Sequence, residues 1–219
     1  MSASVERLKA AAAQAAALLV EENMRVGLGT GSTVAHLLPA LAARELTGLR
    51  CAATSPATEH AARSLGLEVL ELDELGALDI AIDGADQIDP RGWLVKGGGA
   101  AQTREKIVAA AARRFVVIAS AEKAVSALSA PVPIEILRFG AQLTLSSIAP
   151  AELRDVPLSP EGNLIADYRG EIDSPVRLAA WLSETPGIVE HGLFAPHLVS
   201  DILIAGESGV VHRKGDKPA

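Results

Sequence analysis

Residues 25–43, RVGLGTGSTVAHLLPALAA, decide the fold class because a strand, a glycine-rich turn and a helix follow one another in this short stretch. Arg25–Leu28 is a β-rich run, and an apolar helical pattern extends from about Val34 to Ala43. The turn Gly27–Thr33 directs backbone N–H groups and a helix N-terminus toward one point. The stretch therefore predicts a strand–turn–helix unit that can bind an anion, and phosphate is the anion that we expect.

The turn departs from the common nucleotide-binding fingerprints. A dinucleotide-binding turn has glycine at its sixth position, where Ser32 stands, and a P-loop needs Gly-Lys followed by Ser or Thr, which is absent. The turn thus favours a small anion over a nucleotide or a nicotinamide cofactor. A purely structural interpretation stays open at this point, in which Ser32 or Thr33 caps the helix.

The rest of the first half repeats the alternation of helix and strand. Further helical patterns cover about 10–20, 57–65 and 100–112, and further β-rich runs cover about 50–53, 78–82, 93–95 and 115–118. This order predicts an α/β fold with a doubly wound, mainly parallel, Rossmann-like sheet. Ligands of such sheets bind beyond the carboxyl ends of the strands.

The pattern changes at Pro131-Val132-Pro133. Strands are expected near 134–137, 153–156, 164–168 and 188–191, with helices near 141–148 and 176–183. This βαββαβ order predicts a smaller ferredoxin-like α+β domain over residues 131–198. The runs 201–205 and 209–212 are expected to return to the edge of the first sheet, so that residues 1–130 plus 199–219 form the catalytic α/β domain.

Composition excludes several classes of protein. A hydrophobic fraction of 49% is ample for a buried core, and a net charge of -7 disfavours nucleic-acid partners, which need many Lys and Arg side chains. The lone Cys51 and the lack of a Cys/His cluster favour a cytoplasmic protein without a structural metal. The Ala-rich stretch 10–20 is too short for a membrane span and is followed by acidic residues, so we interpret it as an ordinary helix.

A buried-type strand runs from Leu78 into a loop with two carboxylates, Asp83 and Asp86, at its carboxyl end. Gly84 and Ala85 between them let a ligand approach closely. Three uses compete for the carboxylates, namely magnesium binding, turn capping and hydrogen bonding to sugar hydroxyls.

The strongest chemical signal is KGGGAAQTREK over residues 96–106. Three glycines between a strand-end lysine and a helix leave the backbone open to a ligand. On the helix, Glu105 shares an apolar face with Ala101, Val108, Ala109 and Ala112. Burial there raises the pKa of a carboxyl group toward the ~6 to 7 that suits a general base. Lys96 could supply positive charge to a developing enolate oxygen, and Lys123 follows another strand at the same sheet edge.

Taken together, GLGTGST, TSPAT, IDGADQID, VKGGGAAQTREKI, VIASAEK, PVPIEI and VEHGLF resemble the A-type ribose 5-phosphate isomerases, in the right order over nearly the whole chain. The resemblance implies an aldose-ketose isomerase of the pentose phosphate pathway that interconverts ribose 5-phosphate and ribulose 5-phosphate through an enediolate. It also implies no cofactor, no metal, and a homodimer or homotetramer.

By position, the resemblance makes Glu105 the base, with Asp83, Asp86 and Lys96 as further catalytic residues. Substrate-binding residues would be Thr30, Gly31, Ser32, Thr33, Asp83, Gly84, Ala85, Asp86, Lys96, Gly97, Gly98, Gly99 and Lys123. The main alternative is a non-catalytic, sensor-like domain that binds phosphosugars. Such a domain would not require Lys96 and Glu105, and the chain shows no DNA-reading element before its first strand.

Overall fold

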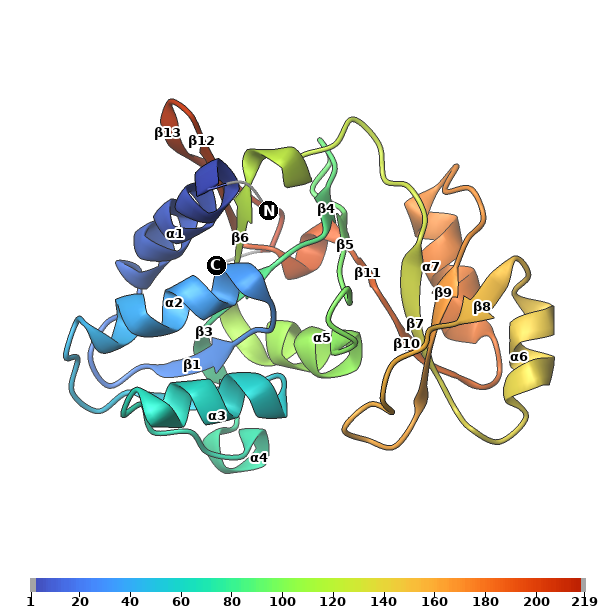
Figure 1. Ribbon diagram of the computed structural model, residues 1–219, viewed down its shortest axis with the longest axis horizontal. Coiled ribbons are helices and arrows are strands. Elements are labelled where there is room, and N and C mark those ends of the chain that lie inside the picture. Colours follow the sequence, from blue (N-terminus) through green and yellow to red (C-terminus); the bar gives the residue numbers. More distant parts are fainter. Residues whose placement is uncertain (1–2, 218–219) are drawn as a thin grey trace.

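Six strands form the larger sheet of the computed structural model, which describes residues 3–217 (Figure 1). They are β1 (Arg25–Leu28), β2 (Arg50–Ala53), β3 (Leu78–Gly84), β6 (Ala112–Ser120), β12 (Asp201–Gly206) and β13 (Gly209–Lys214). Their order is β13-β12-β6-β3-β1-β2, and all neighbours are parallel except the β12–β13 hairpin. The expected mainly parallel sheet is confirmed.

Helices cover both faces of this sheet, as expected for a doubly wound fold. α1 (Ala3–Ala17) and α2 (Ser32–Ala42) pack on one face with α3 (Pro56–Ser64) beside them, while α4 (Leu72–Leu75) and α5 (Gln102–Ala111) pack on the other. The α1 side chains that face the sheet are Ala12, Ala13 and Ala16, all fully buried. Such small side chains let the helix approach the strands closely, which explains a core with few aromatic residues.

The topological switch point of the sheet lies between β1 and β3. The chain leaves β1 through α2 toward β2, and it leaves β3 toward β6 on the opposite side. At the carboxyl ends of β1 and β3, the two connections therefore diverge and open a crevice. The glycine-rich turn and the loop with the two aspartates meet there.

A second sheet forms the smaller part of the molecule, on the right in Figure 1. Its elements are β7 (Val132–Ile136), α6 (Ala141–Ser147), β8 (Ala151–Leu153), β9 (Leu164–Tyr168), α7 (Pro175–Glu184) and β10 (Ile188–His191). The strand order β10-β7-β9-β8 is antiparallel throughout, as in the ferredoxin-like unit that the sequence predicts. The residue bounds of the two domains stay a prediction.

Three short strands connect the two parts. β4 (Gln87–Ile88) and β11 (Leu193–Phe194) both pair with β5 (Leu94–Val95) in a small antiparallel sheet. The short helix η1 (Ala121–Lys123) follows β6, and the short helix η2 (Pro196–Leu198) follows β11. Strands of two residues carry too little periodicity to be recognised in a sequence, so only β5 was expected.

Several expected bounds are wrong. The strand expected at 153–156 is β8, which ends at Leu153 because the chain turns at Arg154 and meets Pro157 soon after. The helix expected from residue 100 begins only at Gln102, since Ala100 has a positive φ of 59° that a helix does not allow. Neither Ser32 nor Thr33 is the cap of α2: that position belongs to Gly31.

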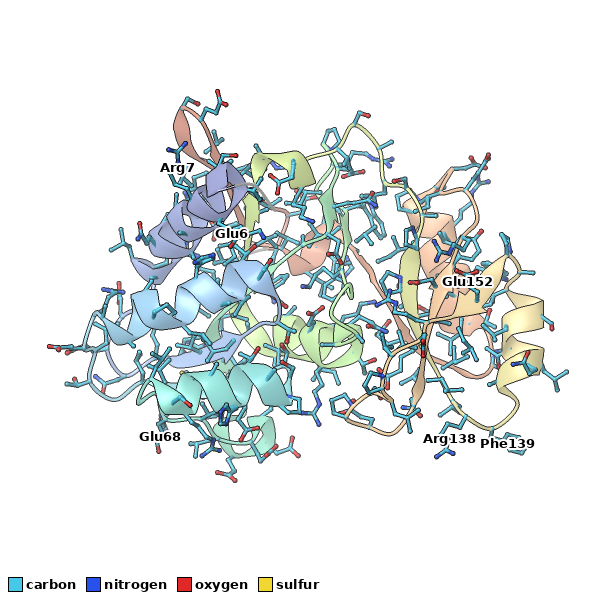
Figure 2. The ribbon with its side chains drawn as sticks, in the orientation of Figure 1. Glu6, Arg7, Glu68, Arg138, Phe139 and Glu152 are labelled. Atoms are coloured by element: carbon cyan, nitrogen blue, oxygen red, sulfur yellow. The ribbon has the colours of Figure 1, made fainter. Side chains whose placement is uncertain are left out.

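Side chains extend from all elements of both parts of the molecule (Figure 2). Phe139, labelled at the outer end of the smaller part between β7 and α6, is 92% exposed. No helix within residues 3–217 is both long and apolar enough to cross a bilayer.

Candidate active site

A cleft opens at the carboxyl ends of β1 and β3 and contains nearly all of the residues that the sequence singled out. Its lining consists of Thr30, Gly31, Ser32, Thr33, Gly84, Ala85, Asp86, Lys96, Gly97, Gly98, Gly99, Glu105 and Lys123. Asp83 is the exception, because its carboxylate lies behind the lining. The structure thus brings together the four loops that the sequence placed at one sheet edge.

Asp83 connects the two loops at the switch point. Its Oδ1 accepts hydrogen bonds from the backbone N–H groups of Thr30 (3.1 Å) and Gly84 (2.7 Å). Gly29 leaves room for the carboxylate, since a Cβ at that position would lie 2.0 Å from Asp83 Oδ1. Of the three uses considered from the sequence, turn capping is therefore observed for Asp83.

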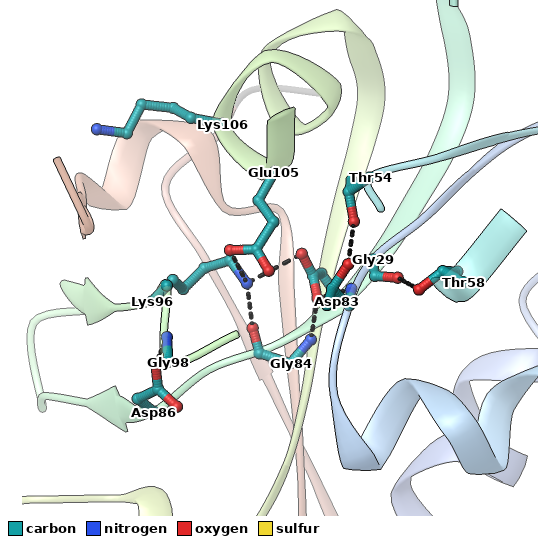
Figure 3. A network of polar contacts seen from close by, with 12 residues as sticks. Gly29, Thr54, Thr58, Asp83, Gly84, Asp86, Lys96, Gly98, Glu105 and Lys106 are labelled. Carbon is teal, nitrogen blue, oxygen red and sulfur yellow. Dashed lines mark hydrogen bonds and ion pairs between the residues drawn. The ribbon is translucent and has the colours of Figure 1, made fainter. Parts of the chain in front are cut away.

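Lys96 lies between two buried carboxylates (Figure 3). Its Nζ is 2.9 Å from Asp83 Oδ2 and 3.2 Å from Glu105 Oε2, and it donates a hydrogen bond to the carbonyl oxygen of Gly84 at 2.7 Å. Lys96 is 2% exposed, and Asp83 and Glu105 are each 3% exposed. The group is a buried triad in which one positive charge faces two acids.

Burial controls the protonation of the triad. Loss of hydration raises the pKa of Glu105 to about 8, an effect that the positive charge of Lys96 only partly offsets and the negative charge of Asp83 reinforces. Burial likewise raises the pKa of Asp83. Burial would lower the pKa of Lys96, but the charges of Asp83 and Glu105 outweigh it and raise that pKa. Lys96 is therefore charged at neutral pH, while Glu105 can both hold and release a proton.

Two oxygens of the triad are poorly satisfied. Among buried side-chain polar atoms in the described part of the chain, Asp83 Oδ2, Glu105 Oε2 and both amide atoms of Gln102 lack a hydrogen bond of good geometry. The contacts of the two carboxylates with Lys96 are close in distance but not aligned as hydrogen bonds. Buried oxygens left in this state are typical of reactive sites, because they can accept a proton or a hydroxyl group.

The N-terminus of α2 forms another wall of the cleft. Gly31 is the N-cap residue, with φ 116° and ψ 178°, and it provides no side-chain hydrogen bond to the helix. The backbone N–H groups of the first turn and the helix dipole thus face the cleft, as an anion site requires. Lys123, at the end of η1, adds a cation to the same lining.

The triglycine loop forms the wall opposite. Gly98 N–H donates to Asp86 Oδ2 at 2.8 Å, and a Cβ on Gly98 would lie 2.8 Å from Asp86 Oδ1. Gly97 has a φ of 96° and no space for a Cβ beside Gln102 and Pro133. The loop needs glycine for both reasons.

Sequence reasoning missed two residues beside the site. Thr54 Oγ1 is 2.7 Å from Thr30 Oγ1 and supports the glycine-rich turn. The fully buried ring of Phe194 lies between two ammonium groups, with its centroid 5.4 Å from Lys96 Nζ and 5.0 Å from Lys106 Nζ. Both residues belong to family motifs, TSPAT and VEHGLF, but a single Thr or Phe in a motif carries no chemical signal of its own. Ser55 caps α3 through Thr58 N–H, as expected.

Comparisons with known proteins agree with this geometry. The family model of ribose 5-phosphate isomerase A (phosphoriboisomerase A) matches residues 50–209. Ribose-5-phosphate isomerase A of Caulobacter vibrioides is 45% identical over 223 residues, covering 95% of this chain and 98% of the relative. The crystal structure of the enzyme from Neisseria gonorrhoeae is similar at a TM-score of 0.91 and 32% identity, covering 95% and 96% of the two chains.

A structure of D-ribose-5-phosphate isomerase in complex with phospho-erythronic acid is similar at a TM-score of 0.91 and 33% identity, and the match covers 98% of this chain and all of that chain. The likeness of fold thus extends over nearly the whole chain. Sequence, fold and site agree: this chain belongs to the ribose 5-phosphate isomerase A family.

Proposed function

We propose that the cleft interconverts ribose 5-phosphate and ribulose 5-phosphate by moving one proton between C2 and C1 of the open-chain sugar, with Glu105 as the base. The carboxylate removes the proton from C2 of the aldose, which leaves an enediolate. It then returns the proton to C1, while the hydroxyl proton moves from O2 to O1. The observation that carries this proposal is the buried Glu105, with a pKa of about 8, in the lining of the cleft.

Lys96 is proposed to stabilise the enediolate. Its ammonium group is charged at neutral pH, because the neighbouring acids raise its pKa, and it lies close to the position where Glu105 takes up the proton. As Glu105 gains the proton, one negative charge leaves the carboxylate and appears on the sugar oxygen. Lys96 can face that charge without moving far, which lowers the cost of the transfer.

The phosphate group is proposed to bind at the N-terminus of α2, where Thr30, Gly31, Ser32 and Thr33 line the cleft. Lys123 and Asp86 would then hold hydroxyl groups or assist ring opening on the other side. The similar enzyme in complex with phospho-erythronic acid supports a phosphorylated small molecule as the ligand of this fold.

Purified protein supplied with ribose 5-phosphate tests the proposal, with ketose formation as the readout. Activity is expected in the presence of a chelator, and Glu105→Gln should lower kcat by at least ~100-fold, the lower range for loss of a general base. Glu122→Gln is a matched control, since Glu122 is an exposed acid near the cleft that does not line it. An unchanged rate in Glu105→Gln would disprove the mechanism, and turnover of other phosphosugars alone would disprove the specificity.

We also propose that the chain assembles as a homodimer or homotetramer. The smaller part of the molecule supports this with exposed apolar side chains, among them Phe139 and Leu143, which are 92% and 78% exposed. Light scattering on the eluting protein measures the mass of the assembly directly. A mass equal to one chain at all concentrations would contradict this proposal.

A further inference from the structure

Arg154 reaches from the smaller part of the molecule to the triglycine loop. It directly follows β8, the strand on which Figure 2 labels Glu152, and its backbone N–H is bonded to Ile165 of β9. Its Nη1 donates hydrogen bonds to the carbonyl oxygens of Gly97 (3.0 Å) and Gly98 (3.3 Å).

Asp167 fixes the other side of the same guanidinium group. Arg154 Nε donates to Asp167 Oδ2 at 3.1 Å and Nη2 to Asp167 Oδ1 at 2.5 Å, a bidentate pair. The two side chains are 17% and 9% exposed, so solvent screens their interaction weakly. A planar group held on one edge by β9 thus presents its remaining donors in a fixed direction.

The two carbonyl contacts determine where the loop's N–H groups point. In a trans peptide unit, the C=O and N–H bonds are antiparallel. The carbonyl of Gly97 points to Arg154, so the N–H of Gly98 points away from it, and that N–H is indeed bonded to Asp86. By the same geometry, the carbonyl of Gly98 fixes the N–H of Gly99 away from Arg154, on the side where Gly99 lines the cleft.

We propose that Arg154 is a positioning residue that orients two consecutive peptide units of the triglycine loop, so that the Gly98 N–H holds Asp86 in the cleft wall and the Gly99 N–H faces the bound sugar. Negative charge builds up on the sugar oxygens at the enediolate stage, and dipoles already oriented toward that charge cost no reorganisation. Without the guanidinium group, the Gly97 carbonyl still accepts the Ala100 N–H at 3.0 Å, but the Gly98 carbonyl loses its Arg154 donor. The Gly98–Gly99 peptide unit can then rotate, because glycine restrains it little. The smaller part of the molecule thereby contributes to catalysis without touching the substrate. This inference rests on the proposed isomerase function.

The test compares Arg154→Ala, Arg154→Lys and Arg169→Ala in steady-state assays with ribose 5-phosphate. Arg169 is the matched control, because it lies 3.9 Å from the same Asp167 and pairs with Glu152 but makes no bond to the loop. Arg154→Ala should lower kcat by about 10- to 100-fold with KM changed by less than ~3-fold, as expected for donors that act mainly in the transition state. The kcat of Arg154→Lys should lie between those of Arg154→Ala and the wild type, and the kcat of Arg169→Ala should stay within ~2-fold of the wild-type value.

Rescue separates positioning from loss of folding. Guanidinium chloride at about 20 mM, far below denaturing concentrations, should raise the rate of Arg154→Ala at least ~3-fold and leave wild type and Arg169→Ala unaffected. A kcat of Arg154→Ala within ~2-fold of that of Arg169→Ala would overturn the proposal. So would a loss of kcat in Arg154→Ala that guanidinium does not relieve although the variant melts at the wild-type temperature. Wild type without activity on ribose 5-phosphate would instead refute the proposed function.

Discussion

At the scale of single residues, the site depends on Glu105, whose carboxyl group is buried although carboxylates are usually exposed to solvent. Glu105 is surrounded by protein, and the cation beside it, Lys96, is shared with Asp83. With one positive charge for two acids, a proton is retained near neutral pH, because burial raises the pKa of both acids, that of Glu105 to about 8. A base in this state removes a proton readily from carbon because it has little hydration to lose.

The pH dependence of kcat/KM should reveal this pKa. The base must be ionised to act, so kcat/KM for ribose 5-phosphate should rise with pH through a value near 8, the pKa of Glu105. Steady-state rates between about pH 6 and about pH 9 measure the rise. A profile that is flat over this range would contradict the pKa of Glu105 or its role.

Folding stability should change in the opposite direction. The folded protein keeps the proton on Glu105 up to about 8, whereas the unfolded chain loses it near the ordinary value of 4.5. Between these values the folded state binds more protons, so the contribution of Glu105 to stability falls as pH rises. Urea unfolding of wild type and Glu105→Gln should show this component in the wild type and its loss in the variant. If the free energy of unfolding changed with pH in the same way in the two proteins, this effect of Glu105 would be excluded.

Gly29 should tolerate no side chain. A Cβ there would lie 2.0 Å from the Asp83 carboxylate, which must then move away from the N–H groups that it binds. Gly29→Ala is expected to cost ~1–3 kcal/mol in the free energy of unfolding, as overpacking does, and to lower kcat at least tenfold. Gly206→Ala is the control, because its new Cβ would make only ordinary contacts, with Ala121 Cβ at 3.9 Å and the Gly209 carbonyl oxygen at 4.0 Å. Equal stability of the two variants would show that the turn adapts freely.

At the scale of elements, α5 explains why Glu105 stands in a run of charged residues. Its neighbours on the helix all bind the smaller part of the molecule: Thr103 to Glu135, Arg104 to Glu161, and Lys106 to Glu190 and the carbonyl of His191. Glu105 alone turns toward the cleft. The run TREK therefore holds the helix between the two sheets and fixes the direction of the base.

Lys106 should be a stronger tether than Arg104. Its ammonium group is largely buried and donates to Glu190 and to the His191 carbonyl, both at 2.7 Å. Lys106→Met leaves these acceptors without their donor and should lower the free energy of unfolding by ~1–3 kcal/mol. Arg104→Met is a control on the same helix, since the Arg104–Glu161 pair is more than one third exposed and should cost no more than ~1 kcal/mol. Urea unfolding compares them, and an equal loss in both would contradict the difference in burial.

At the scale of the whole molecule, the sequence predicted the layout because it depends on strong local patterns. The periodicity of apolar residues and the glycine-rich turns predicted the strands of the larger sheet, the ferredoxin-like unit and the loops of the cleft. What it could not show depends on contacts between distant residues. The bond from Arg154 to the triglycine loop spans two sheets, and the placement of Asp83 behind the cleft follows from its contacts with Thr30 and Lys96. No periodicity encodes such contacts.

Because the cleft is assembled from segments between Thr30 and Lys123, unfolding destroys it, and a bound ligand should stabilise the whole fold. Ribose 5-phosphate at 100 times its Kd should add about 2.7 kcal/mol, which raises the melting temperature of a chain of this size by ~5–10 °C. Glu105→Gln should keep this shift although it loses turnover, since the base moves a proton and the α2 N-terminus holds the phosphate. Lys123→Gln should reduce the shift while the melting temperature without ligand stays the same. Thermal unfolding with and without the sugar measures both effects, and loss of the shift in Glu105→Gln would mean that the carboxyl group binds the substrate rather than transforming it.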